Sequence, residues 1–355
     1  MVPFPAQPAG VPWPAAEWPE ADLADDVDRE AVEAALADIF GAPPEHGLSL
    51  ASVVVHRGAI VAERYAAEID RDSTLISWSM AKSMTQAVIG MLVGDGLLDI
   101  DAPLGPLVPE FAGTEKASIT VRDLLAMKSG LEFNEDYVGG TGADAPVSHC
   151  LEMLFGSGVD DHAHYAASQQ LLHPPGTVWS YSSGTTNILS RLAGLLVASG
   201  FDLAEGTTEP AMREFLHDRI FGPLGMTSAA PKFDTSGTFV GSSYVYATAR
   251  DFARFGLLYL RDGVWDGHRL LPAGWADYAR TEVAVDEDPP HFGYGAHWWI
   301  WRDQPGSLAA HGYEGQYVIV VPERDLVVVH LGKIPADVRA PLFPKLDRLV
   351  NAFPR

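Results

Sequence analysis

The sequence predicts an α/β fold in which one antiparallel sheet, flanked by helices, is built from both ends of the chain and a mostly helical lobe is inserted between them. Two apolar runs that flank Arg57-Gly58 predict a β-hairpin near the start. Short strand patterns recur between residues 297 and 330, whereas residues 101–240 combine helical spacing with Pro- and Gly-rich loops. Strands at both ends with helices between them favour a single layered architecture.

The first elements follow from local patterns. Residues 1–25 are rich in Pro and Trp and show little periodicity, which indicates an extended arm. Helical spacing begins at 26 and continues to 40. The hairpin strands are expected at 52–56 and 59–64.

A buried helix is expected over residues 79–92, because SMAKSMTQAVIGML is apolar on nearly every side, and it should end near Gly94 and Gly96. Lys82 lies inside it. A buried lysine needs an explanation, since burial of an unpaired charge is costly.

The remaining elements complete the pattern. The predicted helices are 121–127, 186–198, 212–220, 249–261 and 337–351, and the predicted strands are 297–301, 307–311, 317–321 and 325–330. We therefore expect an arm over 1–25, an α/β domain over 26–100 and 241–355, and a helical lobe over 101–240.

Composition excludes several classes of function. With 47% apolar and 20% charged residues, the 355-residue chain can bury a sizeable core. Its formal net charge of −23 disfavours nucleic acid and anionic membrane surfaces as partners. No apolar stretch reaches membrane-spanning length, and the N-terminal residues lack the basic and apolar regions of a signal peptide. With Cys150 as the single cysteine, no internal disulfide can form, and we expect a cytoplasmic protein.

Ser79-Met80-Ala81-Lys82 is an S-x-x-K element at the head of the buried helix. Residues three apart share a helical face, so the lysine amine should lie against the serine hydroxyl. A desolvated lysine can be neutral enough to take the serine proton, and the helix N-terminus directs N–H groups toward a developing oxyanion. The alternative for a lone S-x-x-K is a buried lysine that extends to the surface.

Two further elements follow in the chain. Trp179-Ser180-Tyr181-Ser182-Ser183-Gly184 comes after a Pro-Pro-Gly turn and opens a helix, which places Tyr181 where it can pass protons. Ala310-His311-Gly312-Tyr313-Glu314-Gly315-Gln316 is a strand with two glycines, where a substrate could approach the backbone. Taken singly, the first segment also fits a core tyrosine, and the second fits a glycine-bulged hairpin.

Together these three elements resemble the serine β-lactamase-like family, which includes class C β-lactamases, penicillin-binding proteins, and related carboxylesterases and amidases. The resemblance covers about residues 45–335 and is strongest with 6-aminohexanoate-dimer hydrolases and related carboxylesterases. It implies the β-lactamase/transpeptidase-like version of the predicted fold, with no cofactor and no metal.

The resemblance also implies roles for individual residues. Ser79 matches the nucleophile, and Lys82 and Tyr181 match its proton-transfer partners. The backbone N–H groups of Ser79 and Tyr313 match the oxyanion hole. The expected substrate-binding residues are Tyr137, Ser183, His311, Gly312 and Trp298, although packing is an equal alternative for Trp298.

Two departures from the β-lactamase pattern bear on the substrate. Ser183 stands where many β-lactamases have an asparagine, and Ala310-His311-Gly312 stands in place of Lys-Thr-Gly. Without that lysine, a cation that would pair with the carboxylate of a penicillin is missing. This favours small esters or linear amides over β-lactams.

The sequence therefore predicts a serine hydrolase that cleaves a small ester or linear amide through an acyl-serine intermediate. The alternatives are a β-lactamase, a D-amino-acid peptidase, or a penicillin-binding sensor that is acylated without turnover. His162-Ala163-His164 after Asp160-Asp161 could hold a metal, but a solvated loop is favoured because no downstream ligands follow. The sequence carries no signal for the oligomeric state.

Overall fold

The computed structural model describes residues 1–136, 147–199, 207–287 and 292–355. The chain divides into two compact units. Unit 1 comprises Met1–Met80, Arg219–Ala230 and Tyr246–Arg355, and unit 2 comprises Ala81–Asp218 and Pro231–Val245. One boundary thus falls inside the S-x-x-K element, between Met80 and Ala81. The domain bounds expected from the sequence stay a prediction.

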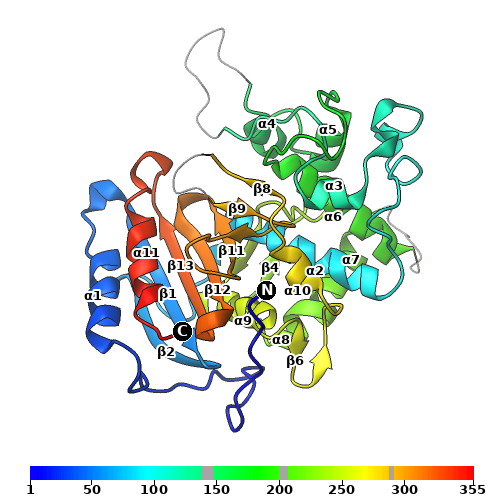
Figure 1. Ribbon diagram of the computed structural model, residues 1–355. Coiled ribbons are helices and arrows are strands. Elements are labelled where there is room, and N and C mark those ends of the chain that lie inside the picture. Colours follow the sequence, from blue (N-terminus) through cyan, green and yellow to red (C-terminus); the bar gives the residue numbers. More distant parts are fainter. Residues whose placement is uncertain (137–146, 200–206, 288–291) are drawn as a thin grey trace. The chain divides into compact units, whose positions relative to one another are not determined.

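In the described residues, unit 1 is built on an eight-stranded sheet in which all neighbouring strands pair antiparallel (Figure 1). In spatial order the strands are β2 (Ala59–Tyr65), β1 (Leu48–His56), β13 (Leu326–Lys333), β12 (Gln316–Val321), β11 (Leu308–Gly312), β10 (Trp299–Ile300), β9 (Gly293–Tyr294) and β8 (Ala284–Val285). The first two come from the start of the chain and the others from its end. The predicted sheet, antiparallel and built from both chain ends, is confirmed.

The hairpin between β1 and β2 turns at Arg57 and Gly58, whose φ angles of 52° and 80° both lie in the left-handed region. Such a two-residue turn matches the twist of antiparallel strands. Apolar side chains continue along the central strands, with β12 buried throughout and β13 buried up to Lys333. Such continuous burial requires cover on both faces of the sheet.

One face is covered by α1 (Arg29–Phe40) and α11 (Leu342–Asn351), which lie side by side in Figure 1. Asp28 caps α1, because its carboxylate accepts a hydrogen bond from the Ala31 N–H at 3.0 Å. Leu36 and Ile39 from α1 and Leu346 from α11 join the core beneath. Apolar residues at helical spacing therefore produce this layer.

The other face packs against α9 (Ala249–Leu260). Three arginines bind the N-terminal arm. Arg250 and Arg254 lie on α9, and Arg261 is its C-terminal cap. Arg250 pairs with Glu20 at 2.7 Å, and Arg254 donates to the carbonyl of Pro14 at 2.7 Å. Arg261 donates to the Gln7 side chain at 3.0 Å. Oxygen acceptors of the arm thus pair with the buried arginines of this helix and its cap.

The shorter elements of unit 1 lie in its connections. They are β3 (Leu75–Ile76), α8 (Gly222–Leu224), β6 (Val264–Trp265), β7 (His268–Arg269) and α10 (Trp275–Ala279). β4 (Ala230–Pro231) and β5 (Val245–Ala247) lie where the chain passes between units. β3 pairs with β5 and so anchors the segment that precedes Ser79.

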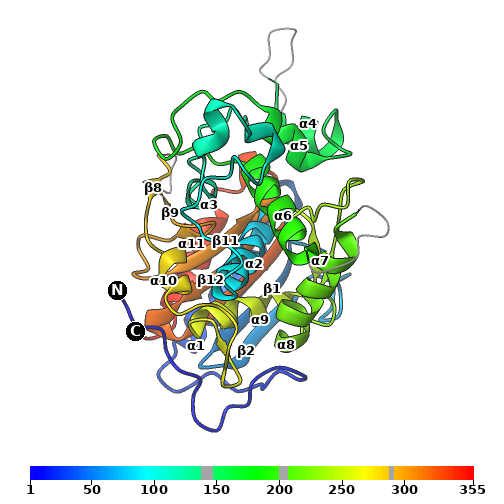
Figure 2. The ribbon, with the colours of Figure 1, turned by 90° about the vertical axis from the view of Figure 1, so that its right-hand side faces the viewer.

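Unit 2 is mainly helical. Its helices are α2 (Ala81–Gly94), α3 (Val121–Leu125), α4 (His149–Phe155), α5 (His162–Ser168), α6 (Ser183–Ala198) and α7 (Glu209–Leu216). Figure 2 shows α2 and α6 side by side, and both are largely buried. None of the helices in the described ranges has the length and apolar composition needed to cross a membrane.

Candidate active site

Ser79 lies in a 3₁₀ turn, Trp78–Met80, that leads directly into α2. Its side chain is buried in this turn. Trp78 before it has a φ of 43°, which is left-handed and costs about 1–2 kcal/mol for a residue with a Cβ. Strain of this kind is retained where the surroundings enforce it, often at functional sites.

The end of β11 passes close to this turn within unit 1. A Cβ atom added to Gly312 would lie 2.4 Å from the Ser77 carbonyl oxygen, so only glycine fits. Tyr313 follows and begins a second 3₁₀ turn. The close approach at Gly312 therefore positions the backbone of Tyr313 relative to the Ser79 turn.

Trp78 and Glu314 link the two turns through their side chains. The indole N–H of Trp78 donates to Glu314 Oε2 at 3.0 Å, and the Trp78 and Tyr313 rings meet edge to face at 6.0 Å. Glu314 also has a left-handed φ, of 61°. Two strained residues, each next to a predicted oxyanion N–H, thus hold each other in place.

Lys82 belongs to unit 2 and is only 1% exposed. Its Nζ donates to Ser183 Oγ at 2.8 Å and to the Ser242 carbonyl oxygen at 3.0 Å. The Tyr181 ring centroid lies 4.9 Å from Nζ. Burial lowers the pKa of Lys82, whereas Glu135 and, to a smaller extent, Cys150 act in the opposite direction.

Glu135 binds Ser183 through both carboxylate oxygens. Oε1 accepts from the Ser183 hydroxyl at 2.5 Å, and Oε2 accepts from the Ser183 N–H at 2.8 Å. Gly184 permits the loop that carries Glu135 to lie this close to the start of α6, because a Cβ on Gly184 would meet the ring of Phe133 at 2.5 Å. The loop that carries Glu135 is also bound to α4, because the N–H of Asn134 donates to Nδ1 of His149, the first residue of α4, at 2.9 Å.

Tyr181 lies just before α6, whose N-cap Ser182 accepts from the Thr185 N–H. This cap fixes the helix start two residues after the tyrosine. Cys150 is buried nearby, and burial, together with Glu135, raises the pKa of its thiol. Such a thiol stays protonated and is a poor nucleophile.

The predicted substrate-binding residues fall in different environments. Tyr137 lies outside the described residues, and the Ser183 hydroxyl is already engaged by Lys82 and Glu135. His311 stacks on Trp299 at 5.2 Å and accepts from Trp301 Nε1 at 2.8 Å. Burial holds the pKa of His311 well below its usual value, so the imidazole is neutral.

Trp298 is fully buried and packs against α9, with its ring 4.4 Å from Tyr259. A substrate could reach it only if that packing opened. Gly312 is the member of the predicted substrate-binding set that the structure brings beside the Ser79 turn. Substrate contact by these residues stays a prediction.

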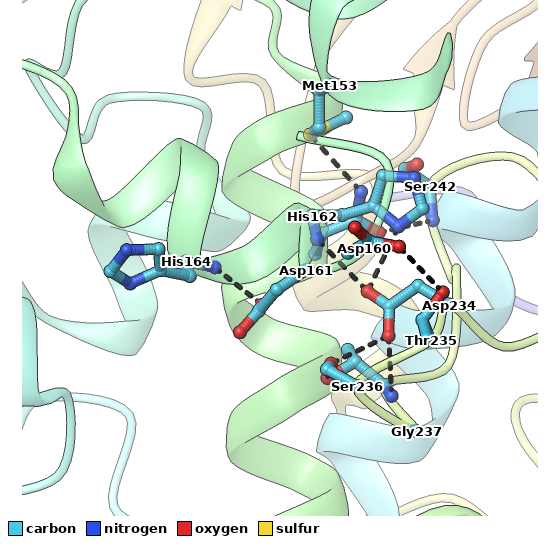
Figure 3. Close-up of polar contacts among 12 residues, drawn as sticks. Met153, Asp160, Asp161, His162, His164, Asp234, Thr235, Ser236, Gly237 and Ser242 are labelled. Carbon is cyan, nitrogen blue, oxygen red and sulfur yellow. Dashed lines mark hydrogen bonds and ion pairs between the residues drawn. The ribbon is translucent and has the colours of Figure 1, made fainter. Parts of the chain in front are cut away.

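His162 and His164 point apart in Figure 3. His162 is buried and its Nδ1 lies 3.0 Å from Asp234 Oδ2, whereas His164 is exposed and binds Glu110. Although burial raises the pKa of Asp234, hydrogen bonds led by His162 lower it overall. In the described part of the chain no three His, Cys, Asp or Glu residues group as metal ligands would.

Comparison with known proteins assigns the chain to a family. The family model described as Beta-lactamase matches residues 36–337. The chain belongs to the Beta-lactamase family. The resemblance drawn from the three motifs is confirmed by this match.

Two relatives match most of the chain. A 6-aminohexanoate-dimer hydrolase from Paenarthrobacter ureafaciens is 26% identical over 294 residues, which are 80% of this chain and 72% of the relative. Penicillin-binding protein 4 from Amycolatopsis lactamdurans is 30% identical over 320 residues, which are 79% of this chain and 76% of the relative. The name of the first relative supports a hydrolase.

Solved structures share the Beta-lactamase fold. A Bacillus anthracis protein assigned as a 6-aminohexanoate-dimer hydrolase superposes with a TM-score of 0.73 at 24% identity and covers 96% of this chain and 89% of that one. A family VIII carboxylesterase superposes with a TM-score of 0.67 at 16% identity and covers 94% and 98% of the two chains. At these identities the likeness concerns the fold.

Three residues of this candidate Beta-lactamase-family site were not predicted from the sequence, namely Glu135, Trp78 and Glu314. Each adjoins a motif that was recognised: Glu135 precedes Tyr137 by two residues, Trp78 precedes Ser79, and Glu314 follows Tyr313. A polar or aromatic residue within two positions of a predicted site residue was therefore the available signal. The partner of each is distant in sequence, so the pairing required the structure.

Proposed function

We propose that this chain is a serine hydrolase that cleaves a small ester or a linear amide through an acyl-Ser79 intermediate. The environment of Lys82 carries the proposal. A lysine that is buried, has a lowered pKa and donates to two fixed oxygen acceptors is prepared to act as a base.

The reaction has two steps. The Ser79 proton moves to the Lys82 amine while Oγ bonds to the acyl carbon, and the N–H groups of Ser79 and Tyr313 hold the resulting oxyanion. The proton on Lys82 then passes through Tyr181 to the leaving group, which departs, so that the acyl group stays on Ser79 and Lys82 is neutral again. Water then attacks this ester, its hydroxyl group joins the acyl carbon to give the carboxylic acid, and its other proton returns to Ser79 Oγ as the Oγ–acyl bond breaks.

Ser79 and Lys82 belong to different units but are close neighbours in the chain. Lys82 follows Ser79 by three residues, and three peptide steps limit the separation of their Cα atoms to about 11 Å.

The end of β11 supports the substrate class. Ala310 occupies the position of the β-lactamase lysine, and His311 is neutral among aromatic rings. A missing charge-assisted partner forfeits about 1.5–3 kcal/mol, or roughly tenfold to a hundredfold in affinity for a carboxylate. The amide and ester chemistry in the names of the relatives points the same way.

A hydrolysis screen tests the proposal. We expect p-nitrophenyl butyrate or a linear aminohexanoate oligomer to be cleaved with a higher kcat/KM than the cephalosporin nitrocefin. An equal or higher kcat/KM for nitrocefin would favour a β-lactamase. A p-nitrophenyl acetate burst that stops after one equivalent would instead favour a penicillin-binding sensor, whereas steady release after the burst supports the enzyme.

A further inference from the structure

A carboxylate lies one hydroxyl group away from Lys82. Glu135 contacts Ser183 Oγ at 2.5 Å, and the same oxygen contacts Lys82 Nζ at 2.8 Å. All three side chains belong to unit 2. The chain therefore contains a Glu135–Ser183–Lys82 series that the roles implied by the family resemblance leave out.

The direction of each hydrogen bond follows from the number of hydrogens. A serine hydroxyl has one hydrogen, and an ionised carboxylate can only accept. Ser183 therefore donates to Glu135 Oε1, and its N–H donates to Oε2 at 2.8 Å. Toward Lys82, Ser183 Oγ can then offer only a lone pair, so Lys82 must donate.

The second partner of Lys82 is also restricted to accepting. The Ser242 carbonyl oxygen lies 3.0 Å from Nζ and has no hydrogen to give. A neutral lysine amine has two N–H bonds and one lone pair. Because both N–H bonds are directed at fixed acceptors, the lone pair takes the remaining tetrahedral position.

We propose that Glu135 is a positioning residue that acts through Ser183 to keep the Lys82 lone pair directed away from the protein acceptors and available to the Ser79 proton. This inference rests on the proposed function of Lys82 as the base. Once the proton has moved to Nζ, the negative charge of Glu135 also stabilises the ammonium. The serine that replaces the family asparagine thus has a role in proton transfer.

Other groups facing Lys82 in the described structure do not supply this effect. The Cys150 thiol stays protonated because burial and Glu135 raise its pKa, and the Tyr181 ring presents its face at 4.9 Å. Glu135 is thus the carboxylate that acts on the lysine, and its charge raises the pKa of Lys82, whereas burial lowers it. Its removal should lower that pKa further.

Glu135→Gln is the sharpest variant, because glutamine has the same shape but carries an amide nitrogen. If its oxygen keeps the Ser183 N–H, its NH₂ group donates to Ser183 Oγ, and the Ser183 hydrogen turns toward the lysine lone pair. We expect the acylation rate at its plateau to fall at least about tenfold. The acidic limb of the pH profile should move down by about one pH unit, because the neutral amine then persists to lower pH.

The experiment measures the p-nitrophenyl acetate burst rate from pH 5 to 9 in wild type, Glu135→Gln and Asp136→Asn. Asp136 is exposed and adjoins Glu135, so its variant controls for the loss of one charge from the same loop. Ser183→Ala should lower the plateau similarly, and adding Glu135→Gln to it should cause little further loss. This pair also tests the series if Glu135→Gln alone does not fold.

Labelling of Ser79 by a fluorophosphonate separates the two levels of the proposal. If wild type is not labelled at Ser79, the proposed function fails. If Ser79 is labelled but Glu135→Gln has the plateau and acidic limb of Asp136→Asn, the positioning role is overturned. Additive losses in Glu135→Gln/Ser183→Ala would likewise show that Glu135 does not act through Ser183.

Discussion

The Ser79 turn of unit 1 and the Lys82 pocket of unit 2 are constructed from different interactions. Around Ser79 the ordering elements are backbone geometry, the tight approach of Gly312 and the bond between Trp78 and Glu314. Around Lys82 they are a buried lysine amine, a carboxylate and a serine hydroxyl between them. The first arrangement orders the backbone of the proposed oxyanion hole, and the second orients the amine of the proposed base.

This difference means that the two regions should respond to different perturbations. Backbone N–H groups do not titrate near neutral pH, so the Ser79 turn should be sensitive to steric change and insensitive to pH. The Lys82 pocket should respond to any change that alters charge or hydrogen-bond direction. Variants in each region can therefore separate the two.

The largest effect is expected from Lys82→Ala. Loss of the base should lower the acylation rate by about 10²–10⁴-fold with little change in substrate binding. Tyr181→Phe should also lower the rate, and the double variant should lose less than the product of the two. Stopped-flow p-nitrophenol release measures the rate. Near wild-type turnover in Tyr181→Phe would mean that this tyrosine is structural.

A steric change in unit 1 should come next. In Gly312→Ala the new Cβ would meet the Ser77 carbonyl oxygen, shift the backbone of Tyr313 and lower kcat by about 10²–10³-fold, as for the loss of an oxyanion donor. The loss should be equal at pH 6 and pH 9. Gly267→Ala is the control, since open space surrounds Gly267 and its φ of 77° predicts a loss of stability alone. A pH-dependent loss in Gly312→Ala would contradict the comparison.

A smaller effect is expected from the link between the two strained turns. Trp78→Phe removes the indole N–H, and Glu314→Ala removes its acceptor, so each should lower kcat by up to about tenfold. A double-mutant cycle should give a coupling of about 1 kcal/mol. Independent effects would show that this hydrogen bond does not hold the two turns together.

The smallest effect concerns stability alone and comes from a buried histidine of unit 1. Burial lowers the pKa of His330 to about 4, while its Nδ1 lies 2.7 Å from the Gly315 carbonyl oxygen. Below pH 6.5 His330 binds a proton in the unfolded chain but stays neutral in the folded chain. The free energy of unfolding therefore decreases as the pH falls from about 6.5 to 4, by at most about 1.4 kcal/mol per pH unit.

Urea unfolding at pH 7 and pH 5 measures this loss. His330→Asn should show a shallower fall in the free energy of unfolding, because an amide cannot titrate in that range. His268→Asn, at an exposed position, is the matched control and should retain the wild-type slope. Equal slopes in both variants would remove His330 as the cause.

Much of the fold was predicted from local sequence patterns. The exact ends of several helices were not, because they depend on capping residues, prolines and local helix geometry. α6 begins at Ser183, earlier than the predicted 186, because the Ser182 hydroxyl caps it. α11 begins at Leu342 and not at 337, just after Pro341, since a residue before proline disfavours helical geometry. The predicted 212–220 helix becomes α7 followed by a π turn over His217–Phe221.

The candidate site was predictable only where chemistry is encoded in short spacings. Ser79 and Lys82 are three residues apart, and Tyr181 stands in a compact motif. The contact between Glu135 and Ser183 spans 48 residues, and that between Trp78 and Glu314 spans 236. Such pairs depend on how distant elements pack, which no local pattern contains.

The central claim is that Ser79 is the nucleophile, and site-resolved labelling tests it most directly. After reaction with a fluorophosphonate, we expect the intact mass to rise by one adduct, tandem mass spectrometry to place it on Ser79, and Ser79→Ala to remain unlabelled. An adduct that persists in Ser79→Ala, or one located on any other residue, would contradict the account.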